Sequence, residues 1–135
     1  MTVEEKKAYL MQYRVNEREI ERLQEEIAKW QSRAEKVTAG WNAVPGGGAG
    51  EGFPACVEKI AELQAELGAD LERSVELHRT VSRAISAVED SRARLLLRLR
   101  YIDGLTWERV AEKMGCDERS ARRIHKKSNW YGKCP

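Results

Sequence analysis

The chain has 135 residues, of which 34% are charged and 41% hydrophobic, and its formal net charge at pH 7 is +2. This length suits one domain, or one small domain with an extended element, and the many Glu, Lys, Arg, Leu and Ala residues favour long exposed helices. No signal-peptide core and no apolar run near the roughly 18 residues of a membrane span is present, so we expect a soluble intracellular protein.

The small net charge conceals two oppositely charged parts. Residues 1–90 carry 12 Lys and Arg against 17 Asp and Glu, a net −5, whereas residues 91–135 carry 12 against 5, a net +7. This asymmetry indicates an acidic scaffold and a basic end suited to phosphate groups. We therefore expect a helical hairpin over residues 1–89 and a separate domain over residues 90–135.

The first expected helix runs from about Thr2 to about Thr38. Its inward positions recur at alternating spacings of three and four residues: Tyr13, Asn16, Ile20, Leu23, Ile27, Trp30, Ala34 and Val37. This alternation is typical of a coiled-coil seam. The range Gly40–Pro54 follows, with six of the ten glycines and two of the three prolines, and predicts a flexible linker because such residues disfavour a helix.

The second expected helix runs from about Ala55 to about Val88. Its predicted seam also repeats every seven residues: Val57, Ile60, Gln64, Leu67, Leu71, Ser74, His78, Val81, Ile85 and Val88. Polar residues on a seam, such as Asn16 and His78, are expected to set the register between helices. Two seams of similar length joined by a loop predict a long antiparallel hairpin, so the fold class is all-α.

Three short helices are expected after the hairpin. Glu89-Asp90-Ser91 offers capping residues before Arg92–Ile102, whose apolar stripe is predicted to comprise Leu95, Leu96, Leu99 and Ile102. The pair Asp103-Gly104 ends that helix, and Thr106 caps the next one, Trp107–Met114.

The last two helices meet the requirements of a helix-turn-helix DNA-binding motif. Ala111 is small at the expected helix crossing, and Gly115 follows four residues later, where the turn needs a positive φ. Asp117 can cap the second helix, Glu118–Lys127. The apolar residues expected to be buried around the crossing are Val110, Met114, Cys116, Ala121 and Ile124.

The second helix of this motif is strongly basic. We expect eight of its residues to face solvent: Glu118, Arg119, Ser120, Arg122, Arg123, His125, Lys126 and Lys127. The first part of a recognition helix enters the major groove, where Arg pairs with guanine and Glu with cytosine. The predicted DNA-binding residues are therefore Glu118, Arg119, Ser120, Arg122, Arg123, Lys126 and Lys127, with the two lysines and Arg122 placed to reach phosphates. Arg98, Arg100 and Arg109 are further candidates for phosphate contacts.

Other site types receive little support from the sequence. Cys56, Cys116 and Cys134 form no CxxC pair and have no His at metal-ligand spacing, which favours reduced cysteines over a disulfide or zinc site. No Ser/His/Asp or Cys/His arrangement indicates nucleophilic catalysis. We expect no enzyme activity, no cofactor and no metal.

The segment LRLRYIDGLTWERVAEKMGCDERSARRIHKK resembles region 4 of bacterial sigma factors, which binds the −35 promoter element. The chain also looks like small phage and prophage proteins with a sigma-region-4-like C-terminus, some of which activate late or packaging genes. That likeness covers about the last 50 residues and rests on Ile85, Val88, Asp90, Arg94, Leu99-Arg100-Tyr101, Trp107, Ala111 and His125. It implies a contact with host RNA polymerase and a place in the bacterial cytoplasm. Nothing resembles the sigma region that melts the −10 element, which argues against a stand-alone sigma factor.

The expected function is that of a sequence-specific transcription regulator of phage type, bound to double-stranded DNA and acting with RNA polymerase. Two alternatives remain: a DNA-recognition subunit of a packaging machine, similar to a small terminase subunit, and an adaptor that binds polymerase or a sigma factor without reading bases. Homodimerisation through the long helices stays open, and Trp130 and Tyr131 are expected to pack against the domain.

Overall fold

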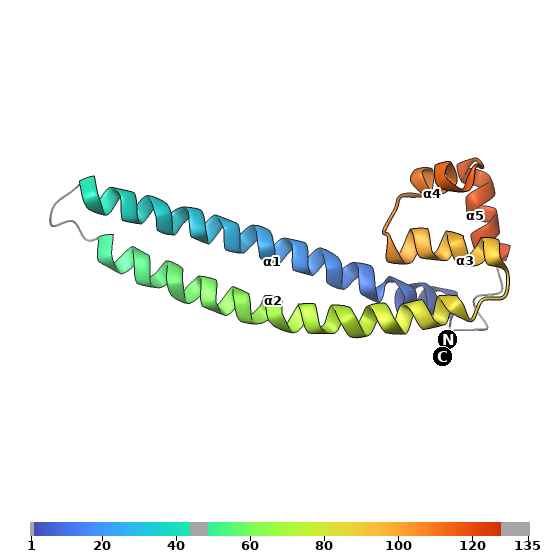
Figure 1. Ribbon diagram of the computed structural model, residues 1–135, viewed down its shortest axis with the longest axis horizontal. Helices are drawn as coiled ribbons and strands as arrows, with labels where there is room; N and C mark the ends of the chain where they lie inside the picture. Colours follow the sequence, from blue (N-terminus) through green and yellow to red (C-terminus); the bar gives the residue numbers. More distant parts are fainter. Residues whose placement is uncertain (1, 44–48, 128–135) are drawn as a thin grey trace. The chain divides into compact units, whose positions relative to one another are not determined.

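The computed structural model describes residues 2–43 and 49–127, which form helices and turns without any strand. Figure 1 shows the helices, which are α1 (Val3–Ala43), α2 (Ala49–Ser86), α3 (Ser91–Leu97), the π-helical turn η1 (Arg98–Ile102), α4 (Trp107–Met114) and α5 (Glu118–Lys127). The all-α class and the two long packed helices are confirmed. In the described ranges, no helix combines the length and the apolarity that crossing a membrane requires.

The chain divides into two compact units. The middle unit comprises residues 17–73. The terminal unit combines residues 1–16 with residues 74–135, so the ends of both long helices belong with the short helices. This division differs from the expected boundary near residue 89, because Leu10 of α1 and Val81 and Ile85 of α2 share one apolar core with α3.

In the middle unit, α1 and α2 run side by side in opposite directions. Leu23, Ile27 and Leu63 are buried between them, and Trp30, Ile60 and Leu67 pack around this cluster. Burial of such a narrow apolar stripe is the main stabilising term that a two-helix arrangement offers.

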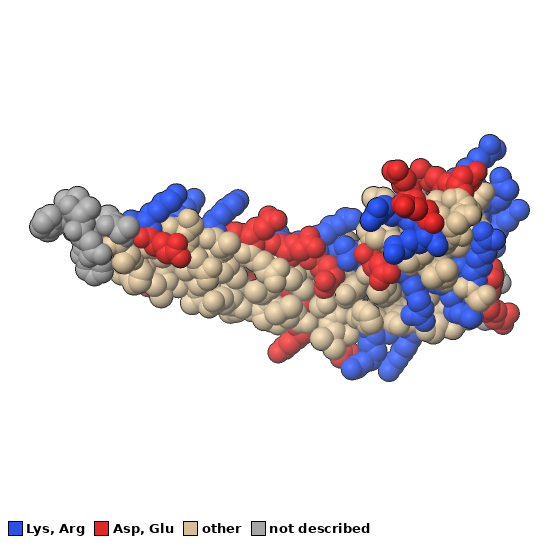
Figure 2. All heavy atoms as spheres, turned by 45° about the horizontal axis from the view of Figure 1, so that its top comes forward, with Lys and Arg blue, Asp and Glu red and all other residues tan. Residues whose placement is uncertain are grey.

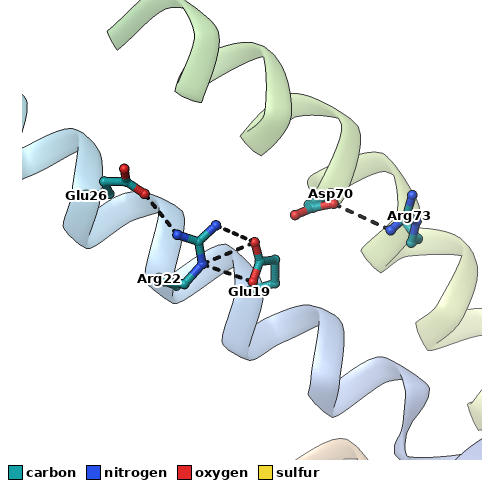
Figure 3. Close-up of polar contacts among 5 residues, drawn as sticks. All are labelled: Glu19, Arg22, Glu26, Asp70 and Arg73. Atoms are coloured by element: carbon teal, nitrogen blue, oxygen red, sulfur yellow. Dashed lines mark hydrogen bonds and ion pairs between the residues drawn. The ribbon is translucent and has the colours of Figure 1, made fainter. Parts of the chain in front are cut away.

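Ion pairs between residues of one helix occur on both long helices of the middle unit (Figure 3). Arg22 contacts Glu19 at 2.6 Å and Glu26 at 2.9 Å, and Arg73 contacts Asp70 at 3.6 Å. The hydrogen bond from Arg22 lowers the pKa of Glu19. Pairs three or four residues apart on one helix support it only weakly where both side chains are exposed, as in the Arg22–Glu19 pair.

The predicted seam is correct on α1, whereas on α2 only one of its two rows is correct, the row that contains Ile60, Leu67 and Val81. Asn16, Ile20, Leu23 and Ile27 are buried as expected on α1. On α2, however, Val57 and Leu71 are 48% and 46% exposed, and Gln64 and His78 are exposed as well. The inward row begins instead at Cys56 and continues through Ile60, Leu63 and Leu67. This row keeps the same alternation of three and four residues but buries Leu63 instead of Gln64. It is favoured because burial of an apolar side chain stabilises the helix pair, whereas burial of an unpaired amide costs free energy.

Both long helices extend into the range predicted as a linker. The first continues through Gly40 to Ala43, and the second begins at Ala49 and contains Pro54. An interior glycine lowers helix stability by about 1 kcal/mol without forbidding the helix. Pro54 is the sixth residue of α2 and therefore lies inside the helix, where it removes the one hydrogen bond that a main-chain N–H would donate to the carbonyl four residues earlier. Residues 44–48 lie outside the described ranges.

The terminal unit has a continuous apolar core. Its buried members are Leu10, Val81, Ile85, Val88, Ala93, Leu96, Leu97, Leu99, Tyr101, Val110, Ala111 and Ala121. The predicted stripe on α3 was partly wrong, since Leu95 is 47% exposed whereas Leu97 and Tyr101 are buried. A single stripe presumes one covered face, but α3 and η1 contact the long helices as well as α4 and α5, so residues on several sides are buried.

The helix formed by α3 and η1 ends in a wide turn. Asp90 caps its start by accepting a hydrogen bond from the Arg92 N–H at 3.1 Å. At its end, the Asp103 N–H donates to the Arg98 carbonyl at 3.0 Å, one residue further back than in an α-helix. Gly104 follows with a φ of 70° and leads the chain into α4, as the Asp103-Gly104 pair predicts.

Candidate nucleic-acid interface

A tight glycine turn joins α4 to α5. The Thr106 hydroxyl caps α4 by accepting from the Arg109 N–H at 3.3 Å. At the other end, the Gly115 N–H donates to the Glu112 carbonyl at 3.2 Å and the Cys116 N–H to the Ala111 carbonyl at 3.0 Å. This pair of bonds with a left-handed glycine is a Schellman motif, so Gly115 stops α4 and reverses the chain direction.

The residues predicted to cap α5 and to lie at its crossing with α4 do so in the structure. The Ser120 N–H donates to the Asp117 carboxylate at 2.7 Å. Hydrogen bonds from Ser120 lower the pKa of Asp117, and the nearby Arg123 and Arg119 contribute to the same shift. Ala111 and Ala121, at 3% and 0% exposure, lie in the shared core, because only small side chains allow two helices to cross closely.

The seven predicted DNA-binding residues all belong to α5. Figure 2 shows the Lys and Arg side chains that gather around the C-terminal helices. Six of the seven are exposed: Glu118, Arg119, Arg122, Arg123, Lys126 and Lys127. Ser120 is half-buried. The helix therefore presents cations to solvent along its length, and Arg119 and Arg123 lie one turn apart.

Arg122 is held in place by neighbours on two elements. Its guanidinium donates to Glu118 one turn earlier at 3.0 Å and lies 5.2 Å from the ring centre of Trp107 on α4. Arg100 of η1 lies 4.9 Å from the same ring. Arg100 also donates to the Leu105 carbonyl at 2.9 Å. Two guanidinium groups thus contact the Trp107 ring, whose electron-rich face attracts cations through cation–π interactions.

The remaining phosphate candidates differ in their surroundings. Arg98 donates to the Ser86 hydroxyl at 2.8 Å and so links η1 to the end of α2. Arg109 is exposed on α4 and is 3.8 Å from Glu112. Arg98 therefore has a structural contact of its own, whereas Arg109 has only an exposed ion pair.

His125 does not face solvent, contrary to the prediction. The side chain is 6% exposed, shares a hydrogen bond of 2.8 Å with the Tyr101 hydroxyl, and lies edge-on to Trp107. Its position four residues after Ala121 places it on the buried face of α5. Desolvation lowers the pKa of His125 to about 4, and the charges of Lys7, Arg100 and Arg122 reinforce this shift. The imidazole is therefore neutral at pH 7.

A basic cavity beside α5 was not predicted from the sequence. It has a volume of about 670 Å³ and brings Lys7 of α1 next to Arg100, Trp107 and Arg122. Lys7 is distant in sequence and lies on an otherwise ordinary stretch of charged helix, so no local signal marked it.

The two positive-φ glycines provide a matched stability test. Alanine at Gly115 meets no atom within 4 Å and suffers only the left-handed backbone, so Gly115→Ala should lower the free energy of unfolding by about 1 kcal/mol. Alanine at Gly104 would also displace the Arg14 guanidinium, so Gly104→Ala should be the more destabilising change. Urea denaturation measures both. Equal stability of Gly115→Ala and the wild type would contradict the left-handed turn.

Within the described residues, no three His, Cys, Asp or Glu side chains are placed to hold a metal ion. Cys56 and Cys116 are free thiols. The predicted packing of Trp130 and Tyr131 concerns positions outside the described residues. Comparison of the chain with protein families, with characterised proteins and with solved structures finds no match.

Proposed function

We propose that this protein is a sequence-specific DNA-binding transcription regulator that places α5 in the major groove. The observation that carries the proposal is the exposed cationic face of α5, which is set against α4 by the turn at Gly115. Residues 91–135 carry a net charge of +7, which attracts the negatively charged phosphates of the DNA backbone. The resemblance of this segment to sigma region 4 supports an action alongside RNA polymerase in a phage or prophage setting.

Arg119 and Arg123 are the sharpest residues with which to test this proposal. Both are exposed, and neither makes a hydrogen bond or ion pair with another described residue. The double variant Arg119→Ala/Arg123→Ala should therefore keep the fold while losing base and phosphate contacts. We expect DNA affinity to fall at least about tenfold, since each such contact contributes roughly 1–3 kcal/mol.

The measurement begins with selection of duplexes from a random pool by the wild-type protein. Binding of a selected duplex is then followed against salt concentration, where each lost phosphate contact reduces the slope of log K by about 0.9. The control is Arg18→Ala/Lys36→Ala, which removes two exposed positive charges from α1 in the middle unit. Undiminished binding by the α5 variant, or an equal loss in the control, would contradict the recognition-helix assignment.

The oligomeric state separates the regulator from the packaging alternative. A monomer or dimer supports the regulator, and a ring of many copies supports a packaging subunit. Val57 and Leu71 of α2 are exposed, so they are available for a contact with a second copy. A dimer would present two α5 helices to paired half-sites. Binding to polymerase without DNA binding would instead support the adaptor alternative.

A further inference from the structure

The cavity beside α5 combines four cations with aromatic walls. Lys7, Arg100, Arg122 and Lys126 line it together with Tyr101 and Trp107, and among the described residues no carboxylate group does. Its volume of about 670 Å³ lies within the range of small-molecule sites. The residues come from α1, η1, α4 and α5 of the terminal unit, so folding of that unit creates the cavity.

The two arginines are held before any ligand arrives. The Leu105 carbonyl and the Trp107 ring fix Arg100, while Glu118 and the same ring fix Arg122. A guanidinium offers five N–H donors in a planar fork, so one or two occupied donors leave others for an anion. Pre-positioned donors also reduce the entropy lost on binding.

The two lysines have no comparable partner. Lys7 and Lys126 are exposed and make no ion pair with any described residue. Four positive charges around one cavity repel one another, and an anion relieves that repulsion. Burial, and after it the charges of Lys7, Arg100 and Arg122, lower the pKa of His125 in the cavity wall to about 4.

We propose that this cavity is a nucleotide phosphate site, with the phosphate held by Lys7, Arg100, Arg122 and Lys126. The phosphate can belong to a free nucleotide or to a DNA strand bound along α5. The half-buried Trp107 ring offers apolar surface to the sugar or base that carries the phosphate, which an inorganic ion would not use. The DNA source rests on the proposed function, whereas the free nucleotide source does not.

Binding of thymidine 5′-monophosphate, measured by calorimetry on the full chain, tests the free source. Thymidine is the matched ligand without phosphate and should not bind detectably. Lys7→Ala should weaken binding of the monophosphate about tenfold, as loss of one charge-assisted contact does. Lys6→Ala is the control, because Lys6 is the neighbouring residue on α1 and does not line the cavity.

An imidazole titration by NMR gives a second readout on the same samples. A bound phosphate adds negative charge beside His125, so the pKa of His125 should rise from about 4 on saturation with the monophosphate. The exposed His78 of α2 does not line the cavity, and its imidazole signal serves as the internal reference.

The DNA arm uses the duplex selected by the wild-type protein. If the cavity takes a DNA phosphate, Lys7→Ala reduces the salt slope by about 0.9 and Lys6→Ala does not. If the slope is unchanged but the monophosphate binds, the site serves free nucleotides and the proposal holds. If the monophosphate binds while no duplex is selected, the phosphate site is supported and the proposed DNA-binding function is contradicted. Absence of both monophosphate binding and a slope change overturns the proposal.

Discussion

Acidification from pH 7 to pH 4 is expected to lower the free energy of unfolding of the terminal unit by about 3 kcal/mol through His125 alone. The pKa of His125 is about 4 in the folded protein, below the value of 6.5 for an unperturbed imidazole. Above pH 6.5 both states are neutral at this residue and the full stability is present. Between pH 6.5 and pH 4 only the unfolded chain takes up the proton, so stability falls by about 1.4 kcal/mol per unit of pH.

The cause is the closed and positive surroundings of the imidazole. Tyr101 of η1 and Trp107 of α4 exclude water, and Lys7, Arg100 and Arg122 repel a proton from three different elements. Below pH 4 the folded protein also takes up the proton, so this contribution to the loss ends there. The pKa values of Glu19 and Asp117 are also lowered in the folded protein, so protonation of these carboxylates at low pH adds to the loss of stability.

Urea denaturation at several pH values between 7 and 4 measures the effect. His125→Gln keeps a polar side chain and removes the titration, so its stability should vary much less over the same range. His78→Gln is the matched control, because the chain has 2 histidines and His78 is exposed on α2. A wild-type slope equal to that of His125→Gln would show that the buried imidazole does not drive the pH dependence.

The local features of the C-terminal helices could be predicted from the sequence because neighbouring residues determine them. Thr106 and Asp117 cap helices that begin one residue later. Gly115 ends α4, where its N–H donates to the carbonyl three residues back and the N–H of the next residue donates to the carbonyl five residues back from itself. No distant contact is needed for any of these. The same reasoning gave the limits of α4 and α5 correctly.

Features that depend on distant contacts were not predicted. The sequence of α2 allows two seams, which share Ile60 and Leu67 but differ in whether Leu63 or Gln64 points inward. Contact with α1 decides between them, and Leu63 is the buried residue. His125 looked solvent-facing on a basic helix, and its burial requires Tyr101 and Trp107 from other elements. Short-range spacing cannot show such enclosures, because several arrangements of the same helices satisfy it equally well.

Replacement of Leu10 by alanine is the second change with a large expected effect. Leu10 lies near the start of α1, is 1% exposed, and belongs to the core that contains Val81, Ile85 and Leu96. Removal of a buried leucine side chain costs roughly 2–5 kcal/mol, because apolar contacts are lost and a cavity remains. We therefore expect Leu10→Ala to destabilise α4 and α5, although these helices are almost a full chain length away in sequence.

Hydrogen exchange resolved by segment measures this coupling. In Leu10→Ala, the amides of α3, α4 and α5 should exchange faster together with those at the start of α1, since one core holds them. Val15→Ala is the control on the same helix, because Val15 is 58% exposed and its truncation should change stability by less than about 0.5 kcal/mol. Faster exchange confined to α1 would mean that the C-terminal helices fold without it. Faster exchange across the terminal unit would mean that the N-terminal helix stabilises α5 as well as placing Lys7 beside it.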